Sequence, residues 1–183
     1  MLTQRQKSML LALARQSITS HFTGKPVTKP VDNELSVKRG VFVSLHKNGE
    51  LRGCIGYITG YKDLISSIIE MAQSAAFQDN RFSPVKQNEL AEIDIEISIL
   101  SEMILVQDVQ EIEIGRDGLF INHPYGSGLL LPQVPVEWNW DVPAFLKQIC
   151  YKAGLTPGSW ADDKAKLYRF TAEIFSESQE NSD

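Results

Sequence analysis

The segment ELRGCIGYITG, residues 50–60, brings together residue types that can support chemistry. Because side chains alternate across a strand, Arg52, Cys54 and Gly56 are expected to share one face. A guanidinium two residues from a thiol can lie beside it, and a neighbouring cation stabilises the thiolate, which is the nucleophile. Gly56 would leave room there for a ligand or for another backbone. The segment therefore predicts a small recess with a thiol and a fixed positive charge.

Backbone groups could complete this recess. The amides around Gly53 and Gly56 are candidate donors to the oxygens of an anionic ligand. The strand then turns through Gly60 into an expected helix, and a helix start preceded by glycines can hold an anion on its free N–H groups.

The same residues also fit a tightly packed structural corner. Free cysteine is among the most buried residue types and often acts as a small apolar side chain. Arg52 could pair with a carboxylate, and the glycines could serve only to allow close packing. Both interpretations remain open at the level of the sequence.

A catalytic partner for Cys54 is difficult to place. A two-residue turn at Asn48–Gly49 predicts that His46 faces Leu51, that Leu45 faces Arg52 and that Val43 faces Cys54. That register places His46 on the face opposite Cys54. A cysteine–histidine dyad would therefore need a β-bulge, which Gly53 could supply.

Three further side chains are weaker candidates for ligand binding. Arg81, in the sequence DNRF at the end of an expected helix, could reach the recess or remain a surface cation. Glu96 is a general-base candidate if its strand face covers a cleft. His123 lies beside a glycine-rich turn. Among the remaining side chains, Cys150 and the tryptophans Trp138, Trp140 and Trp160 are expected to serve packing.

The pattern of apolar residues predicts a mixture of helices and strands. The expected helices cover residues 3–22 and 61–78, with a third that Asp141 caps and Gly154 closes. The expected strands form a hairpin over 40–58, a strictly alternating strand over 92–100, two short strands within 115–133 and a strand over 166–175. Without a regular βαβ rhythm, this order favours an α+β fold with a largely antiparallel sheet flanked by helices. Residues 177–183 are expected to form a disordered polar tail.

Composition limits the class of protein. The 183 residues suit one domain with a small subdomain, and 43% hydrophobic with 22% charged residues is typical of a soluble globular protein. A formal net charge of −5 argues against a nucleic-acid partner. No run is long enough to span a membrane and no secretory signal is visible, so we expect a cytoplasmic protein. Two cysteines and three histidines form no metal-ligand motif, and no cofactor is predicted.

Several motifs taken together resemble the AMMECR-type domain family. They are LRGCIG (51–56), DNRFSPV (79–85), IEISIL (95–100), GRDGLFI (115–121) and GLLLPQVPVEWNWDVPAFLKQICYKAGL (128–155). The resemblance covers nearly the whole chain and is greatest to the bacterial and archaeal branch called AmmeMemoRadiSam system protein A. One departure is NHPYGSG, where many relatives carry a longer basic or glycine-rich hairpin.

The resemblance implies a single domain over residues 1–183. Its larger part holds both termini, a smaller inserted part packs beside it, and a cleft lies between them. It also implies that LRGCIG is the functional region. The implied partners are a Memo-like protein and a radical S-adenosylmethionine enzyme. The resemblance implies no particular reaction, because none is established for the family.

Two functions follow as hypotheses. In the first, the chain is a non-catalytic module that binds a partner or a substrate, with an exposed apolar patch near HPYGSGLLLPQV. In the second, it is an enzyme in which Cys54 is the thiolate nucleophile, while Arg52 lowers its pKa and holds an anionic group.

Overall fold

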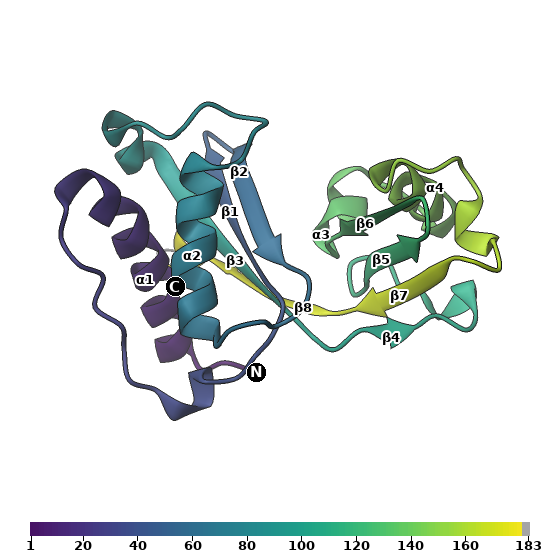
Figure 1. Cartoon of the computed structure of the whole chain (residues 1–183), viewed down its shortest axis with the longest axis horizontal. Helices are drawn as coiled ribbons and strands as arrows, with labels where there is room; N and C mark the ends of the chain where they lie inside the picture. The colour runs from purple at the N-terminus through teal and green to yellow at the C-terminus, as the bar shows by residue number, and fades with distance from the viewer. Residues whose placement is uncertain (181–183) are drawn as a thin grey trace. The chain divides into compact units, whose positions relative to one another are not determined.

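A computed structural model describes residues 1–180 of the chain, which divide into two compact units (Figure 1). Unit 1 consists of residues 1–99 together with the segment that begins at Glu173. Unit 2 is the intervening stretch, residues 100–172. The chain therefore crosses twice between the units, once after residue 99 and once after residue 172.

Unit 1 is a four-stranded sheet with helices over one face (Figure 1). The strands lie in the order β2-β1-β3-β8. The elements are α1 (Gln4–Thr23), η1 (Asn33–Leu35), β1 (Val41–Lys47), β2 (Glu50–Tyr57), α2 (Leu64–Phe77), η2 (Gln87–Glu92), β3 (Ile93–Leu100), β8 (Ala172–Ser176) and α5 (Glu177–Glu180).

Local sequence signals fix the ends of these elements. Thr3 and Gln6 form a capping box at the start of α1, and Gly24 closes that helix with a φ of 66°. Asn48 and Gly49 both have positive φ, at 54° and 80°, as the primed hairpin turn between β1 and β2 requires. Of these signals, the turn at Asn48–Gly49 was predicted from the sequence and is confirmed.

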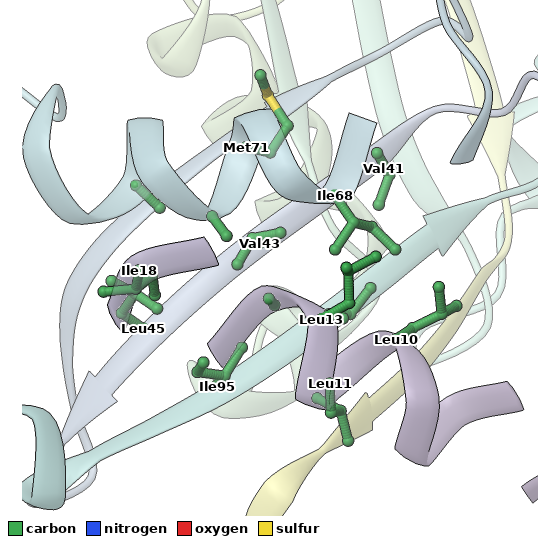
Figure 2. Packing of buried hydrophobic residues seen from close by; sticks show 14 of the residues in the cluster. Leu10, Leu11, Leu13, Ile18, Val41, Val43, Leu45, Ile68, Met71 and Ile95 are labelled. Atoms are coloured by element: carbon green, nitrogen blue, oxygen red, sulfur yellow. The ribbon is translucent and has the colours of Figure 1, made fainter. Parts of the chain in front are cut away.

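The core of unit 1 lies between the sheet and the two long helices. Figure 2 shows Leu10, Leu13 and Ile18 of α1 and Ile68 of α2 directed toward the apolar side chains of β1 and β3. Their partners on the sheet are the alternating residues of β1 and β3, all fully buried or nearly so: Val41, Val43, Leu45, Ile93, Ile95, Ile97 and Ile99. The strict alternation of β3 thus marked its buried face correctly.

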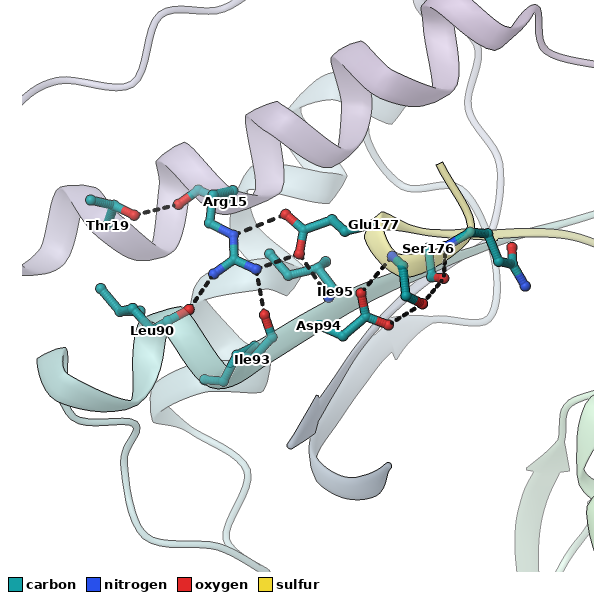
Figure 3. A network of polar contacts seen from close by, with 10 residues as sticks. Arg15, Thr19, Leu90, Ile93, Asp94, Ile95, Ser176 and Glu177 are labelled. Atoms are coloured by element: carbon teal, nitrogen blue, oxygen red, sulfur yellow. Dashed lines mark hydrogen bonds and ion pairs between the residues drawn. The ribbon is translucent and has the colours of Figure 1, made fainter. Parts of the chain in front are cut away.

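A partly buried ion pair ties the end of the described chain to unit 1 (Figure 3). The Arg15 guanidinium pairs with Glu177 and donates to the carbonyl oxygens of Leu90, at 2.7 Å, and Ile93, at 2.6 Å. Glu177 also accepts the Ile95 N–H at 3.0 Å. The expected disordered tail therefore begins too early, because residues 177–180 form a short helix that these contacts anchor. Residues 181–183 of that tail lie outside the described residues.

Unit 2 has its own sheet, with strand order β4-β7-β5-β6 and antiparallel neighbours throughout. Its elements are β4 (Ile104–Leu105), η3 (Val109–Glu111), β5 (Gly118–His123), β6 (Gly126–Leu130), α3 (Gln133–Glu137), α4 (Val142–Lys152), η4 (Ser159–Ala161) and β7 (Lys166–Phe170). Phe145, Ile149 and Cys150 of α4 are all 0% exposed and form the centre of its core. The prediction that Cys150 is a core residue is confirmed.

The glycines of the β5–β6 hairpin bring it against α4. A methyl group at Gly126 would overlap the carbonyl oxygen of Ala153, and one at Gly128 would come within 2.8 Å of the Ala153 nitrogen. Glycine is therefore needed at both positions for the strand to approach the end of the helix.

The α+β class with antiparallel sheets flanked by helices is confirmed, with two differences. The strands form two sheets. The expected single strand over 166–175 is two strands, β7 in the sheet of unit 2 and β8 in the sheet of unit 1, separated by Thr171. Alternation alone could not show this break, because both strands continue one apolar pattern.

Candidate functional site

A β-bulge at Arg52 determines which side chains of LRGCIG lie together. His46 pairs with Leu51, as the turn predicts, but Leu45 pairs with Gly53. Arg52 is thus the extra residue on β2, and every pair beyond it moves by one position. The predicted pairs Leu45–Arg52 and Val43–Cys54 are wrong for this reason.

After the bulge, Cys54 lies opposite Ser44. Ser44 and His46 alternate with the core-facing residues of β1, so Cys54 and His46 lie on the same face of the sheet, contrary to the predicted register. The dyad nevertheless does not form in the described structure. The thiol has Ser44 as its hydrogen-bond partner, at 3.3 Å, and His46 pairs across the strands with Leu51 and Asp94.

The two glycines of the motif serve close packing. A side chain at Gly53 would overlap the carbonyl oxygen of Ala75, so β2 meets the backbone of α2 at this point. A side chain at Gly56 would overlap the ring of Phe42. The space that Gly56 was expected to leave for a ligand is therefore occupied by an aromatic ring.

The backbone of Cys54 is held by the segment that follows α2. Its N–H donates to Asp79 Oδ2 at 2.9 Å, and its carbonyl oxygen accepts from Arg81 Nη2 at 3.1 Å. Asp79 and Arg81 also form an ion pair at 2.6 Å. The Asp79 side chain is 3% exposed, and the hydrogen bonds from Arg81 hold its pKa at about 2. DNRF is thus a clamp on both polar backbone groups of Cys54.

Burial raises the pKa of the Cys54 thiol, and its neighbours act in both directions. The Ser44 hydrogen bond and the charge of Arg81 lower this pKa, whereas the charges of Asp79 and Glu96 raise it. The outcome is a thiol that stays protonated at neutral pH, which makes it a poor nucleophile.

Arg52 does not serve the thiol. Its guanidinium forms two hydrogen bonds to the Glu89 carboxylate, at 3.1 and 3.2 Å, and donates to the Ser83 carbonyl oxygen at 2.8 Å. This pairing lowers the pKa of Glu89 to about 2. The Arg52 guanidinium is thus engaged by Glu89, and Arg81 is the cation whose charge lowers the pKa of the Cys54 thiol.

Glu96 lies in the same cross-strand row as the thiol. Ser44 is paired with Cys54 on one side and with Glu96 on the other, so the three residues share one face of the sheet. Ser44 is 4% exposed, and both flanking residues are partly exposed. This row places a thiol, a hydroxyl and a carboxylate side by side.

Comparison with known proteins shows the family. The AMMECR1 family model matches residues 11–175. This chain belongs to the AMMECR1 family. Protein TK0174 of Thermococcus kodakarensis is 45% identical over 181 residues, which cover 92% of this chain and 88% of that protein. The crystal structure of the uncharacterized protein PH0010 from Pyrococcus horikoshii has 43% identity and a TM-score of 0.87, over 92% of this chain and 90% of that one.

His123 belongs to β5 of unit 2, whereas the Cys54 row belongs to unit 1. His123 is 7% exposed, and its Nδ1 accepts the Tyr125 N–H at 3.2 Å. The neutral imidazole must then carry its proton on Nε2, which lies 3.5 Å from Asp162. These contacts give His123 a structural role at the β5–β6 turn.

Two features of this AMMECR1 chain were not predicted from its sequence. Asp79 is a buried acid that binds the Cys54 backbone, and its position directly after an apolar helix was the available signal. Trp138 was expected to serve packing, but it is 67% exposed. Trp140 and Trp160 do pack against the core of unit 2.

The described residues contain neither a candidate metal-ion cluster nor a candidate membrane-spanning helix. Within residues 1–180, no three histidine, cysteine, aspartate or glutamate side chains are grouped so that they could bind a metal ion. No helix in that range combines the length and the apolar character that crossing a membrane requires.

Proposed function

We propose that this AMMECR1 chain is a cytoplasmic binding module of an AmmeMemoRadiSam-type system, which engages a Memo-like protein or presents a substrate to a radical S-adenosylmethionine enzyme. The observation that carries the proposal is the use of LRGCIG for internal contacts. Arg52 is paired with Glu89, the Cys54 backbone is clamped by Asp79 and Arg81, and burial keeps the thiol protonated. The motif therefore supports a rigid scaffold better than it supports a nucleophile.

The β5–β6 turn is the surface that we assign to the partner. Tyr125 at this turn is 79% exposed. Two contacts fix the backbone of the turn. His123 accepts the Tyr125 N–H, and Gly126 packs against the end of α4. An exposed tyrosine on a backbone that is already ordered is typical of residues that dominate protein interfaces.

The test is isothermal titration of the purified chain with a purified Memo-like protein. Tyr125→Ala is expected to weaken binding by about tenfold or more. Cys54→Ala should bind as the wild type does, and so should the control Tyr61→Ala, which removes a comparably exposed tyrosine, 69%, from unit 1. Equal binding by Tyr125→Ala, or loss of binding in Cys54→Ala, would overturn the proposal.

The enzyme hypothesis, with Cys54 as nucleophile and Arg52 as its activating group, receives less support. Its proposed activator is 3.1 Å from Glu89, and the pKa of the thiol is raised. Restoring the three-component system with a Cys54→Ala variant separates the two functions. Full activity of that variant excludes the nucleophile, whereas complete loss in a folded variant would favour the enzyme.

A further inference from the structure

Two tryptophans are stacked on each other at the turn between α3 and α4. The ring centroids of Trp138 and Trp140 lie 6.2 Å apart, with an interplanar angle of 20°. Trp140 packs against the core of unit 2, whereas Trp138 is 67% exposed. The Trp140 indole therefore packs against the core, and the exposed Trp138 indole stacks on it.

The backbone of this turn is fixed. Trp138 N–H donates to Val134 O at 3.2 Å, and Trp140 N–H donates to Pro135 O at 2.8 Å. Between them, Asn139 adopts a left-handed conformation with a φ of 51°, which asparagine tolerates better than most residues. The stacked pair is thus preorganised, so a ligand would not have to order it.

The surroundings of the pair are apolar and acidic. Val136, two residues before Trp138 in the chain, is 54% exposed. Glu137 and Asp141 flank the tryptophans in the sequence and are exposed. Within residues 1–180 neither carboxylate takes part in an ion pair, and Asp141 makes only a capping bond to the Ala144 N–H, at 2.8 Å. The patch therefore carries two exposed carboxylates that form no ion pair within the described residues.

We propose that this surface, made of Trp138, Trp140, Glu137 and Asp141, binds an arginine-bearing segment of a partner polypeptide. A guanidinium stacks on the open face of an indole and is attracted by its quadrupole, and two nearby carboxylates complement its charge. Arginine suits the site better than lysine because its planar group can stack while its N–H donors reach the carboxylates. We call this surface the tryptophan platform.

The platform goes beyond the proposed function, since it lies at the other end of β6 from the Tyr125 turn. Its test needs neither the Memo-like protein nor the radical enzyme. If the arginine peptide does not bind, the Tyr125→Ala titration still tests the proposed function. If Tyr125→Ala does not affect partner binding, the peptide titration still tests the platform.

The probe is a short capped peptide with two arginines separated by glycines, titrated while tryptophan fluorescence is recorded. We expect a saturable change in tryptophan fluorescence. The affinity for the peptide should weaken as the salt concentration is raised, because salt screens exposed charges. Replacing both arginines by citrulline, which keeps the shape and removes the charge, should weaken binding at least about threefold. An equal affinity for the citrulline peptide, or no saturable binding by the arginine peptide at millimolar concentration, would overturn the proposal.

Variants locate the binding site. Trp138→Ala and Glu137→Gln should each weaken the affinity for the arginine peptide about threefold or more. Both positions are exposed, so these variants should keep the fold. The matched control is Tyr151→Ala, which removes another exposed aromatic ring of unit 2, one that already has Lys147 over it at 5.7 Å. Wild-type affinity in Trp138→Ala, or an equal loss in Tyr151→Ala, would place the peptide elsewhere and refute the platform.

Discussion

Burial and neighbouring charges shift the pKa of the Cys54 thiol in opposite directions, and the resulting pKa can be measured. Burial raises its pKa, and Arg81 is the cation that opposes this effect. In a Cys150→Ala background, we expect the rate of alkylation to reach its midpoint above the ordinary thiol value of about 8.5. Arg81→Gln should move that midpoint further up. Intact-mass measurement of labelling against pH gives the result.

Arg52→Gln is the matched control for the thiol prediction. Because Arg52 is bound to Glu89, its loss should leave the midpoint unchanged. A midpoint well below 8.5, or a shift in Arg52→Gln equal to that in Arg81→Gln, would restore Arg52 as the activating group. Either result would reopen the enzyme hypothesis.

Gly53 is the residue of the motif with the least room to change. Because a methyl group there overlaps the Ala75 carbonyl oxygen, β2 and α2 would have to separate. We expect Gly53→Ala to lower the free energy of unfolding by about 3 kcal/mol. Gly49→Ala is the control, since nothing lies within 4 Å and only its φ of 80° opposes a side chain, at about 1 kcal/mol. Urea unfolding compares them, and equal losses would contradict the packing argument.

At this scale the sequence predicted Arg52 as the cation beside Cys54, whereas the fold places Arg81 there. Alternation placed Arg52 beside Cys54, but a bulge inserts Arg52 as the unpaired residue and turns it toward Glu89. Bulges depend on how two strands and a helix fit together, and Gly53 offered only a weak signal of one. Arg81 is far from Cys54 in the sequence, so only the fold could bring the two together.

Among the elements, those with a strong local signal were predictable. Helix α1 has a capping box and a closing glycine, and β3 alternates without a break. The division of 166–175 into β7 and β8 was not predictable, because Thr171 carries no turn signal and both halves alternate. The short helix α5 was missed because its anchor, the Arg15–Glu177 pair, joins residues that are distant in the sequence.

The clamp between β2 and the segment after α2 predicts an acid-sensitive step. The pKa values of Asp79 and Glu89 are both about 2 in the folded protein, below their ordinary values of 3.8 and 4.5. Their contribution to stability is therefore complete above pH 4.5 and is lost as the pH falls toward 2. We expect Asp79→Asn to lower the free energy of unfolding on the order of 2 kcal/mol at pH 7, with the difference from wild type vanishing near pH 2.

Urea unfolding at a series of pH values measures this difference. Glu50→Gln is the control, because Glu50 is an exposed carboxylate on the same strand as Cys54, and it should change stability by less than about 0.5 kcal/mol at every pH. A loss in Asp79→Asn that stays constant from pH 7 to pH 2 would mean that the Asp79 charge does not stabilise the fold.

At the scale of the whole molecule, the described residues 1–180 form two hydrophobic cores, one in each unit. Unit 2 begins and ends at neighbouring positions, since Ser101 N–H donates to Thr171 O at 2.8 Å and Thr171 N–H donates to Ser101 Oγ at 2.9 Å. An inserted segment whose ends meet and whose core is its own has the properties of an independent folding unit.

We therefore expect residues 100–172, expressed alone, to fold. A unit of this size has a small core, so its free energy of unfolding should not exceed about 3–5 kcal/mol. Dispersed NMR signals and a cooperative urea transition would demonstrate folding. Phe145→Ala is the matched variant, because Phe145 is fully buried and its removal costs about 3–5 kcal/mol, enough to unfold the fragment. A fragment without a cooperative transition, or one indifferent to Phe145→Ala, would mean that unit 2 depends on the rest of the chain for its structure.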